Sequence, residues 1–184
     1  KVFFSNSGAE SNECAIKVAR KYSAEKKGAG CYTIVTLKNS FHGRTLATLS
    51  ATGQDHYHEL YQPLVPGFAH IAPGDMDALK AIDAATPVAG IMIECVQGEG
   101  GVLPLDYEYV QALKKLCEEK DWLLLADEVQ TGVGRTGHLF AFQHYGILPD
   151  VASFAKGIAG GLPMSGIMAN EKCAEVAANM TYLE

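Results

Sequence analysis

The chain has 184 residues, 48% apolar and 20% charged, which predicts one domain with a sizeable core and excludes two ordinary domains. Fifteen basic and 21 acidic residues give a net charge of -6 without any Lys/Arg block, so nucleic acid is not expected as a partner. No apolar run approaches the roughly 18 residues that a membrane span needs, so no membrane partner is expected either.

Apolar runs of strand length alternate with stretches of helical period, which predicts an α/β fold with a mostly parallel sheet and flanking helices. In chain order, the predicted elements are a strand at 2–4, a helix that ends at Gly28, a strand at 32–37, a helix at 75–84, a strand at 88–94, a helix at 106–120, and strands at 122–127, 151–154 and 165–169. The side chains expected to face the core from the two long helices are Ala15, Val18, Ala19 and Tyr22, and Tyr109, Ala112, Leu113 and Leu116.

Two of these strands end in an acid, Glu94 and Asp127. Because a helix connects these two strands, we expect the strands to be parallel neighbours with their carboxyl ends at one edge of the sheet. Open α/β sheets bind ligands outside those ends, so both acids are candidate site residues. Lys156 follows the strand at 151–154 in the same way.

The five cysteines are odd in number, widely spaced and without a Cys-x-x-Cys pair, which fits neither a disulfide framework nor a zinc cage. The histidines, including His42, His56 and His58, lack a paired acid at metal spacing and are interpreted as packing or surface residues. We therefore expect no metal, reduced thiols, and a cytoplasmic protein or, in a eukaryote, one of the mitochondrial matrix. The abrupt start and end favour a fragment of a longer chain.

Two motifs favour nucleotide chemistry only weakly. Residues 132–137 match G-x-G-x-x-G, but residues 128–131 separate them from the preceding strand, and no clear helical stripe follows. Residues 123–128 resemble the metal-holding strand of a nucleotide hydrolase, yet the chain has no G-x-x-x-x-G-K-[ST] phosphate loop. Neither motif is the preferred interpretation.

A third combination matches the needs of pyridoxal phosphate. Residues 7–10, Ser-Gly-Ala-Glu, lie where the first strand meets the first helix, and the N–H groups of a helix N-terminus suit a phosphate. For this motif alone, Ser5 or Ser7 as a simple helix cap is the plainer interpretation, and a lone Lys is usually a surface charge. Together, a phosphate cradle, a buried carboxylate for the pyridine nitrogen and an amine for the aldehyde are what the cofactor requires.

Five segments in order carry a resemblance to a known family: residues 7–13 (SGAESNE), 41–45 (FHGRT), 93–101 (IECVQGEGG), 127–132 (DEVQTG) and 154–157 (FAKG). They resemble the motifs of the class III aminotransferases, subgroup II of the fold type I enzymes that use pyridoxal 5'-phosphate. The resemblance covers essentially residues 1–184 and implies a single large cofactor-binding domain. Within the family the chain resembles the acetylornithine branch, which implies transfer of the terminal amino group of N2-acetylornithine to 2-oxoglutarate in arginine biosynthesis.

The resemblance implies a cofactor role for each of several residues. Gly8 and Ala9 would donate N–H groups to the phosphate, and Phe41 and Val129 would pack on the two faces of the ring. Asp127 would pair with the ring nitrogen, with Glu128 in the same cofactor-binding segment. Gln130 would bind the phenolic oxygen, and Lys156 would bond the aldehyde and move the proton during catalysis.

For the substrate, the resemblance implies that Arg44 clamps the α-carboxylate, a task that suits the planar guanidinium. Glu94 would be a gate or partner for Arg44 or, equally, only a strand-end acid. The implied partners are an amino-acid donor, 2-oxoglutarate and a second subunit that shares the active site. Because the family's small-domain segments and the neighbour's Ser/Thr pair are missing, the 184 residues alone are expected to be inactive. Ornithine, 4-aminobutyrate or diaminopelargonate aminotransferases and a non-catalytic dimerising module remain alternatives.

Overall fold

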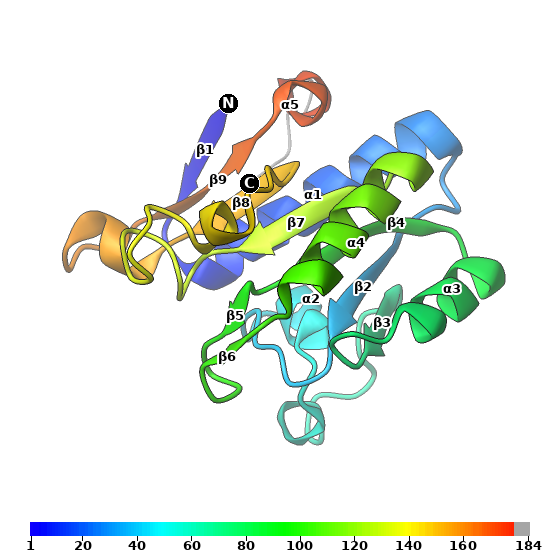
Figure 1. Cartoon of the computed structure of the whole chain (residues 1–184), viewed down its shortest axis with the longest axis horizontal. Helices are drawn as coiled ribbons and strands as arrows, with labels where there is room; N and C mark the ends of the chain where they lie inside the picture. Colours follow the sequence, from blue (N-terminus) through cyan, green and yellow to red (C-terminus); the bar gives the residue numbers. More distant parts are fainter. Residues whose placement is uncertain (179–184) are drawn as a thin grey trace.

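A seven-stranded sheet forms the centre of the computed structural model, which describes residues 1–178 (Figure 1). In sheet order, the strands are β1 (Val2–Ser5), β9 (Ser165–Ala169), β8 (Val151–Phe154), β7 (Leu123–Asp127), β4 (Val88–Ile93), β2 (Thr33–Leu37) and β3 (Phe68–Ile71). The strands from β8 to β3 run parallel, whereas β9 is antiparallel to both of its neighbours. The predicted α/β class with a mostly parallel sheet is confirmed.

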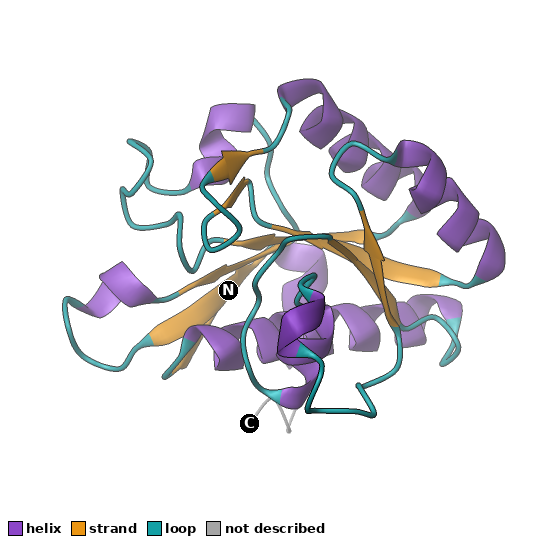
Figure 2. Cartoon of the chain, turned by 90° about the horizontal axis from the view of Figure 1, so that it is seen from below, coloured by secondary structure: helices purple, strands orange, loops and turns teal. Residues whose placement is uncertain are grey.

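Helices cover both faces of the sheet (Figure 2). The helices α1 (Gly8–Lys27) and α5 (Glu171–Ala178) belong to one core cluster, while α3 (Met76–Ala85) and α4 (Tyr107–Lys120) belong to the other. Successive residues of β7 point to opposite faces, so Leu124 packs with α4 and Leu125 packs with α1. This double burial explains why the central strands are continuous apolar runs.

The start of α1 is fixed beside the carboxyl edge of the sheet by a capping box. The Ser7 hydroxyl accepts from the N–H of Glu10 at 3.2 Å, and the Glu10 carboxylate accepts from the N–H groups of Asn6 and Ser7. At the other end, Gly28 takes a φ of 97°, which favours glycine, and stops the helix as predicted.

The crossover from β4 through α4 to β7 is the one that the strand order predicts. Gly90 pairs with Leu123 and Ile93 pairs with Ala126 in a parallel register. Glu94 follows directly after Ile93, and Asp127 is the last residue of β7. Both acids therefore lie at the same edge of the sheet.

Several features differ from the sequence prediction. The antiparallel pairing of β9 and the edge strand β3 were not predicted, because β3 is short, half-buried and interrupted by His70. The helix α2 (Leu46–Ala51) is too short for a periodic stripe. In α4, Val110 and Cys117 are fully buried, whereas Ala112 and Leu116 are only half-buried, so the inward face is rotated from the predicted one.

The remaining elements are short. They are the hairpin of β5 (Val96–Gln97) and β6 (Leu103–Pro104), and the 3-10 segments η1 (Asp55–Tyr57), η2 (Ala141–Tyr145) and η3 (Lys156–Ala159). All five cysteines are buried and unbridged within residues 1–178. In the same residues, no helix has both the length and the apolar character to cross a bilayer.

Candidate active site

A cavity of about 470 Å³ opens where β4, β7 and β8 end and α1 begins. The predicted site residues that line it are Gly8, Ala9, Phe41, Arg44, Glu94, Asp127, Val129, Gln130 and Lys156. These residues come from five separate parts of the chain, and the fold brings them together as expected. Glu128 is the one predicted site residue that does not line the cavity.

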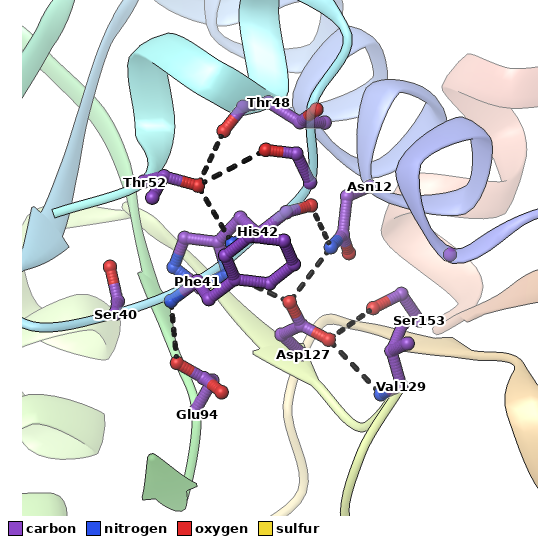
Figure 3. Close-up of polar contacts among 12 residues, drawn as sticks. Asn12, Ser40, Phe41, His42, Thr48, Thr52, Glu94, Asp127, Val129 and Ser153 are labelled. Carbon is purple, nitrogen blue, oxygen red and sulfur yellow. Dashed lines mark hydrogen bonds and ion pairs between the residues drawn. The ribbon is translucent and has the colours of Figure 1, made fainter. Parts of the chain in front are cut away.

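Asp127 accepts hydrogen bonds at both of its carboxylate oxygens (Figure 3). Its side chain is buried, and its Oδ2 accepts hydrogen bonds from Asn12 Nδ2 and His42 Nδ1, each at 2.7 Å. Its Oδ1 accepts from the N–H of Val129 at 3.0 Å. A carboxylate bound at both oxygens from three parts of the fold has a single orientation.

The first turn of α1 offers an anion site in the same cavity. The Ser7 cap is present, so the plainer interpretation of this motif is correct, but it satisfies only the N–H of Glu10. The N–H groups of Gly8 and Ala9 lie in the first turn, where a helix supplies no carbonyl partner, and both residues line the cavity. The positive end of the helix dipole adds to the attraction for an anion.

Gly8 and Val129 are in tight contact across the cavity wall. A Cβ at Gly8 would lie 2.6 Å from Val129 Cγ1, closer than real Cβ atoms approach. Since Val129 is β-branched and its own N–H binds Asp127, its side chain has little freedom to move. Glycine at position 8 therefore shapes this wall.

Replacing Gly8 by Ala is expected to push Val129 into the cavity and weaken cofactor binding by about ten- to a hundredfold, the range of ordinary overpacking costs. Titration of the apo protein with the cofactor, followed by absorbance, measures the effect. The Gly30→Ala variant is the matched control, because nothing lies within 4 Å of a Cβ there. Val129→Ala removes the clash together with one contact to the ring, so adding Gly8→Ala to Val129→Ala should cost little further affinity. An equal cost of Gly8→Ala with Val129 and with Ala at position 129 would contradict the steric explanation.

Lys156 reaches the cavity through an unusual backbone turn. It follows β8 and Ala155 and has a φ of 49°, the left-handed region that few non-glycine residues adopt. Its exposed side chain lies in the cavity, where Nζ donates to Oε1 of Gln130. The two residues expected at the aldehyde and the phenolic oxygen of a cofactor are thus neighbours.

Arg44 lies at the mouth of the cavity against two aromatic rings. Its guanidinium carbon is 5.8 Å from the ring centroid of Phe41 and 5.7 Å from that of Tyr57, within the range of cation–π attraction. Its exposed position leaves the guanidinium accessible to an incoming carboxylate.

Glu94 binds two backbone N–H groups beside the cavity. Its carboxylate accepts from the N–H groups of Phe41 at 3.0 Å and Gly98 at 3.3 Å, and within residues 1–178 it forms no ion pair with Arg44. Burial raises the pKa of Glu94 to about 7. The hydrogen bond from the N–H of Phe41 to Glu94 fixes the segment that carries Phe41.

Glu99, which sequence reasoning missed, is a further acid of the cavity lining, and Arg44 contributes to its pKa. It lines the cavity and accepts hydrogen bonds from Gln54 and, at 3.0 Å, from the Tyr57 hydroxyl. The hydrogen bond from Gln54 is the main cause that lowers its pKa, with smaller contributions from Tyr57 and Arg44. A negative charge therefore sits beside the guanidinium at the mouth of the cavity.

The side chain of Glu128 binds the loop after β7 and does not line the cavity. Its buried carboxylate accepts from the N–H groups of Ala141 and Phe142 at 2.9 Å and from the Thr131 hydroxyl at 2.5 Å. The carboxylate is therefore already bound by these three donors, and the contact of Glu128 with a cofactor stays a prediction.

His42 and Asn12 are the other residues that sequence reasoning missed. The interpretation of His42 as a packing residue was wrong, since its buried ring binds Asp127. Asn12 carried a weak signal, because it falls on the buried stripe of α1, three and four residues before Ala15 and Ile16. No group of three or more His, Cys, Asp or Glu side chains within residues 1–178 is arranged to hold a metal ion.

This fold and cavity define a class III aminotransferase: the model of that family matches residues 1–182, and the chain belongs to it. The acetylornithine aminotransferase of Caldanaerobacter subterraneus is 53% identical over 93% of this chain and 43% of that protein. The acetylornithine aminotransferase of Haemophilus ducreyi is 52% identical over 97% and 45%. The succinylornithine transaminase of Citrobacter koseri is 48% identical over 99% and 45%.

Solved structures agree with this assignment. The ornithine aminotransferase of Toxoplasma gondii, which shows partial occupancy of pyridoxal phosphate at its active site, superposes with a TM-score of 0.90 at 34% identity over 99% of this chain and 44% of that one. The ω-transaminase of Thermomicrobium roseum gives 0.89 at 35% identity over 96% and 44%. The fold is that of the fold type I transaminases, and the chain spans less than half the length of these relatives.

Proposed function

We propose that this chain is the cofactor-binding part of a longer aminotransferase that moves the terminal amino group of N2-acetylornithine to 2-oxoglutarate, a step of arginine biosynthesis. The observation that carries the proposal is the meeting of Asp127, Lys156 and the first turn of α1 in one cavity. The further parts of the proposal are a cytoplasmic enzyme, or one of the matrix in a eukaryote, and a homodimer that completes the site.

The residues present fit pyridoxal phosphate. The helix start at Gly8 and Ala9 suits a phosphate, Phe41 and Val129 offer apolar surfaces for a flat ring, and Asp127 is an oriented carboxylate. The cofactor supplies an aldehyde that bonds amino groups and a protonated pyridine that accepts electrons when the substrate loses a proton.

The chain's own groups then have distinct tasks. Asp127 holds a proton at the ring nitrogen, and Lys156 Nζ takes the proton from the amino-bearing carbon of the substrate and returns it. Arg44 binds the substrate carboxylate, and its fork geometry sets the orientation of the reacting carbon. Phe41 and Val129 exclude water from the faces of the ring.

The choice of amino donor rests on the relatives. Two acetylornithine aminotransferases and a succinylornithine transaminase are 53%, 52% and 48% identical to this chain over the aligned residues. Ornithine, 4-aminobutyrate and diaminopelargonate remain alternatives that use the same cofactor residues. Rates of the full-length protein with each donor and 2-oxoglutarate test the proposal. We expect the highest kcat/KM with N2-acetylornithine. Preference for another donor would overturn the substrate assignment, and absence of turnover with all of them would favour a non-catalytic module.

Replacing Arg44 by Lys should lower kcat/KM by about ten- to a hundredfold, since one charge-assisted hydrogen-bond geometry, roughly 1.5–3 kcal/mol, is lost. Single-turnover rates with N2-acetylornithine and with glutamate should both fall, while cofactor affinity stays unchanged.

The control for this variant is Arg20→Lys. Arg20 donates to the carbonyls of Tyr32 and Pro66 away from the cavity, so this change should lower thermal stability and leave kcat/KM intact. If Arg44→Lys behaves like Arg20→Lys, Arg44 is a structural contact. A loss with only one substrate would show that the two carboxylates use different anchors.

A further inference from the structure

Two buried side chains outside the predicted site converge on one oxygen of Asp127 (Figure 3). Asn12 comes from α1 and His42 from the loop before α2, and both lie within 2.7 Å of Oδ2. The His42 side chain is 0% exposed, and the carboxylate of Asp127 is 3% exposed. Removing such a pair of donors from water is costly unless their hydrogen bonds are satisfied.

The hydrogen-bond partners settle where the protons lie. The Asn12 amide group donates from Nδ2 to two acceptors, the Asp127 carboxylate and the carbonyl of His42 at 2.8 Å, so its orientation is determined. Oδ2 already accepts from Asn12 Nδ2 and lies 2.7 Å from His42 Nδ1, so we assign the proton of this second contact to His42 Nδ1. His42 Nε2 has no hydrogen-bond partner within residues 1–178, so no second contact competes for the ring.

The charges around His42 favour its protonated form. Burial alone lowers the pKa of His42, but the hydrogen bond to Asp127 and the charges of Asp127 and Glu94 outweigh burial and raise it. His70 of β3 is a further titratable group near this ring, and burial is the main cause that lowers its pKa. Asp127 thus receives its hydrogen bond from a ring whose pKa is raised.

We propose that His42 and Asn12 are positioning residues that keep Asp127 ionised and in one orientation, so that the proton shared with a ring nitrogen stays on the nitrogen. The inference rests on the proposed cofactor, and its physical basis is direct. Two donors on Oδ2 stabilise the carboxylate form of Asp127 relative to the protonated acid, so the proton is less attracted to Asp127. Without these donors, a larger fraction of the shared proton moves to the carboxylate.

The first experiment needs no cofactor. Imidazole ¹H–¹⁵N spectra of the full-length apo protein should show a slowly exchanging Nδ1 proton of His42, far downfield, that shifts in Asp127→Asn. If His42 lacks an Nδ1 proton, or if its resonance does not respond to Asp127→Asn, the inference is overturned whether or not the protein is an aminotransferase.

The second experiment uses cofactor labelled with ¹⁵N in the ring. In the wild-type protein the ring nitrogen should show the shift of a protonated pyridine, and in His42→Phe and Asn12→Leu the shift should move toward the unprotonated value. We expect kcat to fall about ten- to a hundredfold, while the KM for the amino donor changes less than threefold. His42→Gln restores a neutral donor and should recover part of the ¹⁵N shift and part of kcat. It also provides the test if His42→Phe does not fold.

His58→Gln is the matched control, because His58 is also buried and hydrogen-bonded, through Nε2 to the carbonyl of Leu49, yet does not touch Asp127. It should leave the ¹⁵N shift unchanged. An unchanged shift in His42→Phe and Asn12→Leu alike would overturn the proposal. Failure of the wild-type protein to bind the cofactor would instead overturn the proposed function, and the apo spectra would still decide whether the pair holds Asp127.

Discussion

Replacing Lys156 by Ala should lower the turnover of the full-length protein by about two to four orders of magnitude, the usual contribution of a positioned acid–base group. The reason is structural. Nζ lies in the cavity beside Gln130, and Lys156 is the single Lys among the cavity-lining residues, so no neighbour within the described part of the chain can replace it. Steady-state rates with N2-acetylornithine and 2-oxoglutarate measure the loss.

A chemical measurement tests the same residue independently. Borohydride reduction of the holoenzyme, followed by peptide mapping, should place the cofactor on Lys156. Lys80 on α3 provides the control, because it pairs with Asp77 on the exposed surface and its replacement by Ala should change neither the rate nor the label. A label on Lys80 or Lys172, or near-native turnover in Lys156→Ala, would refute the assignment.

Asp127→Asn should also reduce turnover by about two to four orders of magnitude, the usual contribution of a group that holds a proton at the reacting centre. The amide keeps the size of the carboxylate but presents an N–H group or a neutral oxygen to the donors of Asn12 and His42. The neutral side chain no longer holds a proton at the ring nitrogen. Cofactor should still bind through the start of α1, which a titration of the apo protein can show.

Asp150→Asn is the control for a buried acid outside the cavity. Asp150 accepts from the N–H of Leu124 and from Asn170, so its loss should lower the free energy of unfolding. Turnover per folded molecule should stay unchanged. If Asp127→Asn only destabilises the protein in the same manner, Asp127 has a structural role alone.

Helices and strands that depend on local sequence patterns were predicted correctly. The stripe of α1, its stop at Gly28 and the apolar runs of β4 and β7 follow from periodicity and capping, and the parallel pairing follows from the crossover rule. The carboxyl-end rule then placed Glu94 and Asp127 in one cavity.

What sequence reasoning missed depends on contacts between distant segments. His42 and Asp127 are 85 positions apart, and Asn12 and Asp127 are 115 apart, so no spacing within a motif reveals either contact. Glu128 follows Asp127 directly in the chain but does not line the cavity. Successive residues at a strand end point to opposite sides, and its carboxylate binds the following loop.

The groups that surround Asp127 come from distant positions in the sequence, and this also couples ligand binding to folding. The site requires the start of α1, the loop before α2 and the end of β7 at the same time, so no single segment of the chain can present it. A cofactor that recognises this arrangement binds the native state and not the unfolded chain, which adds about 2.7 kcal/mol to the free energy of unfolding at a hundredfold excess over Kd. In such a protein, the supply of cofactor sets both the active fraction and the resistance of the chain to unfolding.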